Sequence, residues 1–108
     1  MIRAVFLYSQ DNNLKGFTIS GHAGFDRYGK DIVCAAVSGA VQAVIAVIDG
    51  ELGLTDCFTI GNEISCDISK LEGEKRTVSL KVLSGFEKLM EEWEKDFPQN
   101  IITEKQLI

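Results

Sequence analysis

The sequence predicts an α+β fold in which two helices pack on one face of a mostly antiparallel sheet of about six strands. Three observations lead to this prediction: short segments alternate apolar and polar residues, two longer segments have helical periodicity, and the strands outnumber the helices. Two helices cannot cover both faces of a parallel sheet, so a largely antiparallel sheet covered on one face is expected. The expected order of elements is ββαβββαβ, within a single domain spanning residues 1–108.

The first 20 residues predict a β-hairpin. Residues 1–9 have apolar side chains at every second position, and residues 14–20 return as a second strand after the turn-forming sequence Gln10-Asp11-Asn12-Asn13. Residues 21–32 then show no periodicity and contain three glycines, two aromatic residues and five His, Asp, Arg or Lys side chains. A loop of this length in a small domain is a candidate functional segment.

Residues 32–52 predict a helix with Asp31 as its N-cap. Apolar residues lie almost all round this helix, which is typical of a core helix packed on several sides. The uncharged run over residues 32–48 is 17 residues long, just below the ~18 residues that indicate a membrane span. Ser38 and Gln42 interrupt it, so a buried helix is expected and no membrane association.

The second half of the chain predicts a further hairpin and a fifth strand. Residues 55–60 and 63–68 read as short strands joined at Gly61-Asn62, a pair suited to positive φ. Residues 77–83 alternate apolar and polar side chains and predict the fifth strand.

A second helix and a final strand complete the predicted fold. Residues 84–87 match a capping box that would open a helix, and Pro98 would end it. Residues 101–108 predict the sixth strand. The face of the sheet that two helices leave uncovered is then a candidate surface for a second subunit.

Composition and charge exclude several functions. The formal net charge is −5 with a pI of about 4.8, so the chain repels phosphate backbones and no nucleic-acid binding is expected. Three cysteines and no signal-peptide pattern indicate a cytoplasmic protein. The spacing and facing of Cys57 and Cys66 argue against a disulfide between them. With one histidine and no phosphate-binding loop, neither a metal nor a cofactor is expected.

The only histidine and one of the cysteines form the strongest candidate for chemistry. His22 lies in the glycine-rich loop, and Cys34 follows twelve residues later at the predicted helix start. In thiol catalysis an imidazole takes the thiol proton and later protonates the leaving amine, and a helix N-terminus favours the thiolate. Spacing alone leaves both a catalytic pair and a coincidental pair open.

Neighbouring residues could support such a pair. Asp31 must aim at the helix amides or at His22, because a carboxylate facing the sulfur would disfavour a second negative charge. Ser38, one helical turn after Cys34, either meets the sulfur or a substrate, or bonds back to its own helix. Three glycines of the loop allow either close approach to a ligand or an ordinary irregular turn: Gly21, Gly24 and Gly29.

The segments Gly21-His22-Ala23 and Tyr28-Gly29-Lys30-Asp31-Ile32-Val33-Cys34-Ala35-Ala36-Val37-Ser38 resemble the signature of the Prp family of ribosomal-processing cysteine proteases, also called YsxB-like. The match covers the first 50 residues well, and residues 55–108 resemble the family only in their pattern. Gly39, Cys57 and Cys66 depart from the family pattern, which leaves the Cys and His in place.

The resemblance implies an endopeptidase that removes an N-terminal extension from a large-subunit ribosomal protein, the twenty-seventh of the L series, during ribosome assembly. It also implies a homodimer and a mobile loop over the active site. Cys34 would be the nucleophile and His22 the general base, supported by Asp31 and Ser38. Separately from the resemblance, Gly21, Ala23, Gly24 and Gly29 are candidates for the loop and for substrate binding.

Charge agrees with a basic ribosomal substrate, because acidic residues gather near residues 87–96 and would favour the encounter. The alternative from another class of function is a non-catalytic, ribosome-associated dimerisation or assembly module. In that case Cys34 would be a buried helix residue without reactivity.

Overall fold

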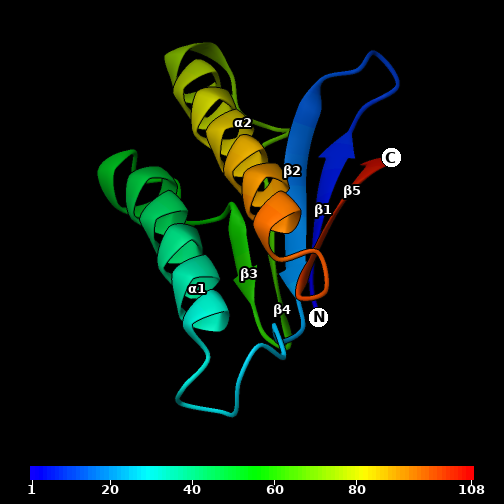
Figure 1. Cartoon of the computed structure of the whole chain (residues 1–108). Helices are drawn as coiled ribbons and strands as arrows, with labels where there is room; N and C mark the ends of the chain where they lie inside the picture. The colour runs from blue at the N-terminus through cyan, green and yellow to red at the C-terminus, as the bar shows by residue number, and fades with distance from the viewer.

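The computed structural model describes all 108 residues and shows one five-stranded mixed sheet with two long helices on the same face (Figure 1). The α+β class and the single covered face are therefore confirmed. The elements in chain order are β1 (Ile2–Tyr8), β2 (Leu14–Ser20), α1 (Ile32–Ile45), its π-helical continuation η1 (Ala46–Glu51), β3 (Phe58–Ile60), β4 (Glu63–Asp67), α2 (Gly73–Asp96) and β5 (Ile101–Leu107).

The strand order across the sheet is β3-β4-β2-β1-β5. Strands β1, β2, β4 and β3 pair antiparallel through hairpins and the β2–β4 contact, with Phe6 opposite Phe17. Strand β5 pairs parallel with β1, because α2 carries the chain back to the end of the sheet where β1 begins. The sheet is thus mixed, and its one parallel pair lies at the edge.

The strand predicted over residues 77–83 is wrong, because this segment lies inside α2. Helix α2 already begins at Gly73, so the capping box over residues 84–87 does not open it. The buried residues of α2 recur at helical spacing through Ser79, Leu83, Phe86 and Met90. The buried face includes the polar residue Ser79, and the apolar residues Val78, Leu80 and Val82 alternate with polar ones around it. This alternation has the period of a β-strand, which is why the sequence predicts a strand here. The sheet consequently has five strands instead of six.

The predicted helix over residues 32–52 is confirmed as α1 and η1, but its predicted packing on several sides is wrong. Only one stripe is buried, and it consists of Val33, Val37, Val41, Val44 and Ile48. The opposite face is exposed, because no layer covers α1 there. By length and composition residues 32–51 could cross a membrane. The buried stripe packs into the protein core instead, so we interpret the segment as a core helix.

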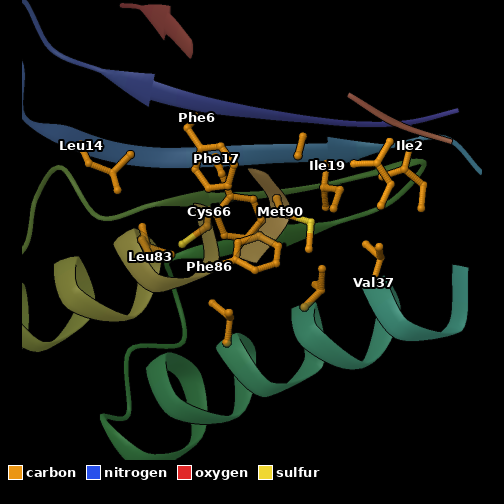
Figure 2. Close-up of a cluster of buried hydrophobic side chains, with 14 of the residues drawn as sticks. Ile2, Phe6, Leu14, Phe17, Ile19, Val37, Cys66, Leu83, Phe86 and Met90 are labelled. Atoms are coloured by element: carbon orange, nitrogen blue, oxygen red, sulfur yellow. The ribbon is translucent and has the colours of Figure 1, made fainter. Parts of the chain in front are cut away.

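The hydrophobic core lies between the sheet and the two helices (Figure 2). Phe6, Phe17 and Phe86 form an aromatic group with ring centroids 5.0–6.0 Å apart, and this group holds α2 against β1 and β2. Cys57 and Cys66 are buried free thiols, in agreement with the predicted absence of a disulfide. Gly61 and Asn62 do connect β3 to β4, but neither has a positive φ.

Candidate active site

The first turn of α1 positions Cys34. Asp31 is the N-cap, as predicted, and its Oδ1 accepts a hydrogen bond of 2.9 Å from the Cys34 amide. The Asp31 carbonyl accepts the first helical bond from Ala35 at 3.1 Å. Cys34 is half-buried, and its position in the first turn exposes the thiol to the positive end of the helix dipole.

Asp31 also ties the preceding loop to the helix. Its Oδ2 accepts hydrogen bonds from the amides of Phe25 at 3.0 Å and Asp26 at 3.4 Å. The Cys34 amide, followed by these loop amides, holds the pKa of the Asp31 carboxyl below its usual value. The carboxylate thus faces backbone amides on both sides and forms no ion pair with His22 in this structure.

The segment that carries His22 is fixed on both sides of the histidine. Gly21 has φ +86°, and a Cβ there would lie 2.2 Å from the Met1 carbonyl oxygen, so only glycine fits. Ala23 is 2% exposed, and its carbonyl accepts a 3.0 Å hydrogen bond from Asn100 Nδ2. The side chain of Ala23 belongs to the core, so a contact between Ala23 and the substrate, which stays a prediction, would involve its backbone. The His22 side chain itself is exposed.

Two surface hollows meet at three side chains: His22, Cys34 and Ser38. The larger hollow, of about 840 Å³, lies between the glycine-rich loop and the start of α1, and Gly24 and Gly29 line it. The smaller one, of about 390 Å³, lies between α1 and the β3–β4 hairpin. Its lining is mainly aliphatic, from Ile2, Ile19, Val37, Val41, Ile45, Ile60 and Ile64, together with Gly21 and Asn62.

Ser38 makes no side-chain hydrogen bond to the backbone of its own helix. Its Oγ accepts a 3.2 Å hydrogen bond from Gln42 Nε2, which leaves the hydroxyl proton free to donate where the two hollows meet. Ser38 thus lines both hollows, and a contact between its hydroxyl and a bound molecule stays a prediction. His22 and Cys34 line the same hollows without a direct hydrogen bond between them. Such pairs often tighten only when the substrate is bound.

Several site residues could not have been found from the sequence. Asn62 and Ile60 reach the smaller hollow because β4 pairs with β2, which is a long-range contact without a local signal. Asn100 contacts Ala23 across 77 positions of the chain. The sequence indicates a site here only through the loop, its histidine and the start of the following helix, and not through these distant residues.

Comparison with known proteins gives consistent results. The family model described as cysteine protease Prp matches residues 1–102. The ribosomal processing cysteine protease Prp of Bacillus subtilis (strain 168) is 33% identical over 106 residues, which cover 94% of either chain. The crystal structure of S. aureus Prp with a covalently linked product peptide aligns with a TM-score of 0.80 at 20% identity, over 98% of this chain and 100% of that one. A Streptococcus mutans protein aligns with a TM-score of 0.78 at 23% identity, over 100% and 96%.

The two structural similarities establish the shared fold, and the family model together with the Bacillus subtilis relative establishes the family. The signature noted in the sequence, from Gly21 to Ser38, lies within the matched region. This chain is therefore a peptide hydrolase that belongs to the Prp family of cysteine proteases.

Proposed function

We propose that the protein removes an N-terminal extension from a large-subunit ribosomal protein, the twenty-seventh of the L series, with Cys34 as nucleophile and His22 as general base. The observation that carries the assignment of residues is the meeting of both hollows at His22, Cys34 and Ser38. Cys34 is the one cysteine that shares these hollows with the only histidine of the chain. The proposed site of action is the cytoplasm, where ribosomes assemble.

The proposed reaction has two halves. His22 takes the proton of the Cys34 thiol as the sulfur attacks the carbonyl carbon of the scissile peptide bond. The C–N bond then breaks, the amine leaves with the proton from His22, and the acyl group remains on sulfur as a thioester. In the second half His22 takes a proton from a water molecule as its oxygen attacks the thioester carbonyl. The C–S bond then breaks, the carboxylic acid is released, and His22 returns the proton to the Cys34 thiolate. In this proposal the hydroxyl of Ser38 donates a hydrogen bond to the bound peptide, which is supported by its position on the lining of both hollows.

Two kinds of observation support a ribosomal protein as substrate. The Bacillus subtilis relative is named a ribosomal processing cysteine protease, and the S. aureus protein of that name has been crystallised with substrate and product peptides. Ribosomal proteins are basic, whereas this chain has a net charge of −5, so opposite charges favour the encounter. Both hollows are open to the surface, which suits an extended peptide segment.

The test is cleavage of the ribosomal protein from the same organism, followed by the mass of the product. The wild-type chain should shorten the substrate at its N-terminus, and Cys34→Ala should leave it intact. His22→Ala should also lose activity near pH 7, with some activity returning at raised pH where the thiol ionises unaided. Cleavage by Cys34→Ala would contradict the thiol mechanism. A non-catalytic assembly module would leave the substrate intact even with the wild-type chain.

We also propose that the protein is a homodimer, with α1 as the contact surface. The outer face of the sheet carries polar residues and the ion pair between Arg3 and Glu104, at 2.7 Å, which makes it a poor apolar interface. The exposed face of α1 and the start of η1 instead present an uncharged run of small residues, Ala36, Gly39, Ala43 and Ala46. Ile32 and Ala35, at the beginning of the same helix, line the larger hollow and are left to the substrate in this proposal. An exposed apolar surface of this kind is typical of an interaction site.

Sedimentation at micromolar concentration should give twice the chain mass of 11.9 kDa. Ala43→Glu adds a charge to the exposed face of α1 and should give the monomer. Ser65→Glu, on the outer face of the sheet, should leave the dimer unchanged. A wild-type monomer would contradict the dimer, and a monomer from Ser65→Glu alone would transfer the interface to the sheet.

A further inference from the structure

We propose that Asn100, in the turn between α2 and β5, is a positioning residue for His22. This inference rests on the proposed function, because it concerns the geometry of the proposed general base. The residue touches neither Cys34 nor the two hollows where His22, Cys34 and Ser38 meet. It acts through the backbone next to the histidine.

The segment that carries His22 has unusually little support from the backbone. No backbone–backbone hydrogen bond is made by any residue from 21 to 26. The hydrogen bonds that fix this segment to the rest of the protein come from two side chains, Asp31 and Asn100. Asp31 holds the far part of the segment at Phe25 and Asp26, so Asn100 is the single hydrogen-bond donor next to the histidine.

Asn100 is itself firmly held. Its carbonyl accepts a 2.8 Å hydrogen bond from the Ile2 amide, and its own amide donates to the Phe97 carbonyl at 3.0 Å. Figure 1 shows this turn, at the end of α2, beside the start of β1. With the backbone fixed on both sides, the side chain reaches Ala23 from a defined position, and Nδ2 donates to the Ala23 carbonyl at 3.0 Å.

The same turn makes a second contact with the loop. The rings of Phe25 and Phe97 meet edge to face, with centroids 5.6 Å apart and an interplanar angle of 89°. Phe97 also packs against the core cluster. The residues of the turn, 97–100, therefore form a platform on which the segment from Ala23 to Phe25 rests.

Loss of the Asn100 donor should displace His22. The Ala23 side chain is buried, and its carbonyl would lose its one protein donor there. The Ala23–Gly24 peptide unit that contains this carbonyl would then rotate or shift to find another partner, and His22 is the residue next to Ala23 in the chain. Proton transfer depends steeply on geometry, and a displacement of about 1 Å can lower a rate by about a hundredfold.

The experiment compares Asn100→Ala and Asn100→Asp with a matched control. Asn100→Asp keeps the shape and replaces the donor by an acceptor. Asn13→Ala is the control, since Asn13 Nδ2 also donates a side-chain hydrogen bond, at 2.9 Å to Asp11, in the β1–β2 turn. In cleavage assays well below each unfolding transition, both Asn100 variants should lose roughly tenfold to a hundredfold in kcat with KM nearly unchanged. Asn13→Ala should match the wild type.

Two further readouts distinguish positioning from general weakening. The chain has a single histidine, so the imidazole proton signals in an NMR spectrum belong to His22. These signals should shift or broaden in both Asn100 variants and stay unchanged in Asn13→Ala. The pH profile of Cys34 alkylation should move toward that of His22→Ala in the Asn100 variants alone.

The outcomes separate this inference from the proposed function. Cleavage by the wild type together with wild-type kcat and unchanged His22 signals in both Asn100 variants would overturn the positioning role and leave the protease intact. Failure of the wild type to cleave any ribosomal protein would overturn the proposed substrate. The NMR and alkylation profiles would still decide whether Asn100 positions His22, because neither readout requires a substrate.

Discussion

At the scale of single residues, the three cysteines show how position decides reactivity. Cys66 is 1% exposed, and burial raises the pKa of its thiol to about 12. Cys57 is 8% exposed, and burial followed by the charges of neighbouring aspartates raises the pKa of its thiol as well. Cys34 lies at a helix N-terminus and lines two open hollows. The thiols of Cys57 and Cys66 are therefore unreactive in the folded protein, whereas that of Cys34 is accessible to a reagent.

Native-state alkylation should therefore modify Cys34 alone. A small iodoacetamide reagent near neutral pH requires an accessible thiolate, and the raised pKa values of Cys57 and Cys66 leave almost none at those sites. Peptide mass mapping after a short exposure should find one labelled cysteine, and labelling in denaturant should find three. Labelling of Cys57 as fast as Cys34 would show that the second hairpin opens readily. A slow Cys34 would support the non-catalytic alternative.

Asp31 offers a second residue-scale prediction, with its sign set by the depressed pKa. The backbone amides around Asp31 stabilise its charged carboxylate in the folded state but not in the unfolded chain. The contribution of this charge to the free energy of unfolding is therefore present above the usual pKa of 3.8, and it is lost as the pH falls through the lowered pKa of the folded state. An asparagine side chain has one acceptor oxygen, whereas the carboxylate has two. Asp31→Asn can therefore accept a hydrogen bond from the Cys34 amide or from the amides of Phe25 and Asp26, but not from both. The melting temperature of Asp31→Asn should be lower than that of the wild type at pH 7.

The difference between the two melting temperatures should shrink as the pH is lowered below about 4, where the Asp31 carboxyl of the unfolded chain takes up a proton before that of the folded state does. Asp11→Asn is a suitable comparison, because Asp11 also has a lowered pKa but lies in the β1–β2 turn, far from the loop. A constant difference from pH 7 to pH 3 would show that the charge of Asp31 contributes nothing and that hydrogen-bond geometry alone matters.

At the scale of elements, α2 shows why the strand predicted over residues 77–83 is wrong. Val78, Leu80 and Val82 alternate as in a strand, but the buried face of the helix passes through Ser79 and Glu87, two polar residues. Glu87 is 5% exposed and accepts a 2.5 Å hydrogen bond from the Tyr8 hydroxyl, a partner on β1 that no local pattern reveals. Periodicity could predict the strands of the first hairpin and α1, whose core faces are apolar. Periodicity failed for α2, where long-range contacts allow polar side chains to lie in the core.

Ser79 provides a direct test of this helix. Its side chain is completely buried, and its hydroxyl has no hydrogen-bond partner. Ser79→Ala removes the unsatisfied hydroxyl and raises helix propensity, so the free energy of unfolding should increase by roughly 0.5–1.5 kcal/mol. Ser79→Thr keeps the hydroxyl and adds a β-branched methyl group, so it should lower that free energy. Urea unfolding measures both, and a stabilising Thr with a destabilising Ala would favour the strand predicted from the sequence.

At the scale of the whole molecule, the candidate site combines what is local in the sequence with what only the fold assembles. His22, Asp31, Cys34 and Ser38 lie within 17 consecutive residues, which is why composition and helix-capping signals could predict them. The second wall of the site comes from the β3–β4 hairpin, and the support of His22 comes from the α2–β5 turn. Those contacts follow from the strand order β3-β4-β2-β1-β5, because the β3–β4 hairpin and the α2–β5 turn both lie at the end of the sheet where β2 leads into the loop.

The net charge of −5 leads to a prediction for the whole molecule, because it should speed the encounter with a basic substrate. Raising the ionic strength from about 0.01 M to about 0.15 M shortens the screening length from roughly 30 Å to roughly 8 Å. The kcat/KM for an intact ribosomal protein should fall severalfold over this range, whereas that for a short neutral peptide should stay nearly constant. Stopped assays at matched pH would measure both.

Two charge reversals locate the effect. The two variants are Asp96→Lys and Glu51→Lys. Asp96 lies next to Phe97, whose ring contacts Phe25 of the glycine-rich loop. Glu51 lies at the end of η1, at the opposite end of the helical segment from Cys34. Both residues are exposed, and both changes alter the net charge equally. If the acidic end of α2 attracts the substrate, Asp96→Lys should lower kcat/KM at low salt more than Glu51→Lys does, and the two should converge at high salt. Equal effects would mean that the overall charge acts without a local site, and no salt dependence would remove electrostatic attraction from the account of substrate capture.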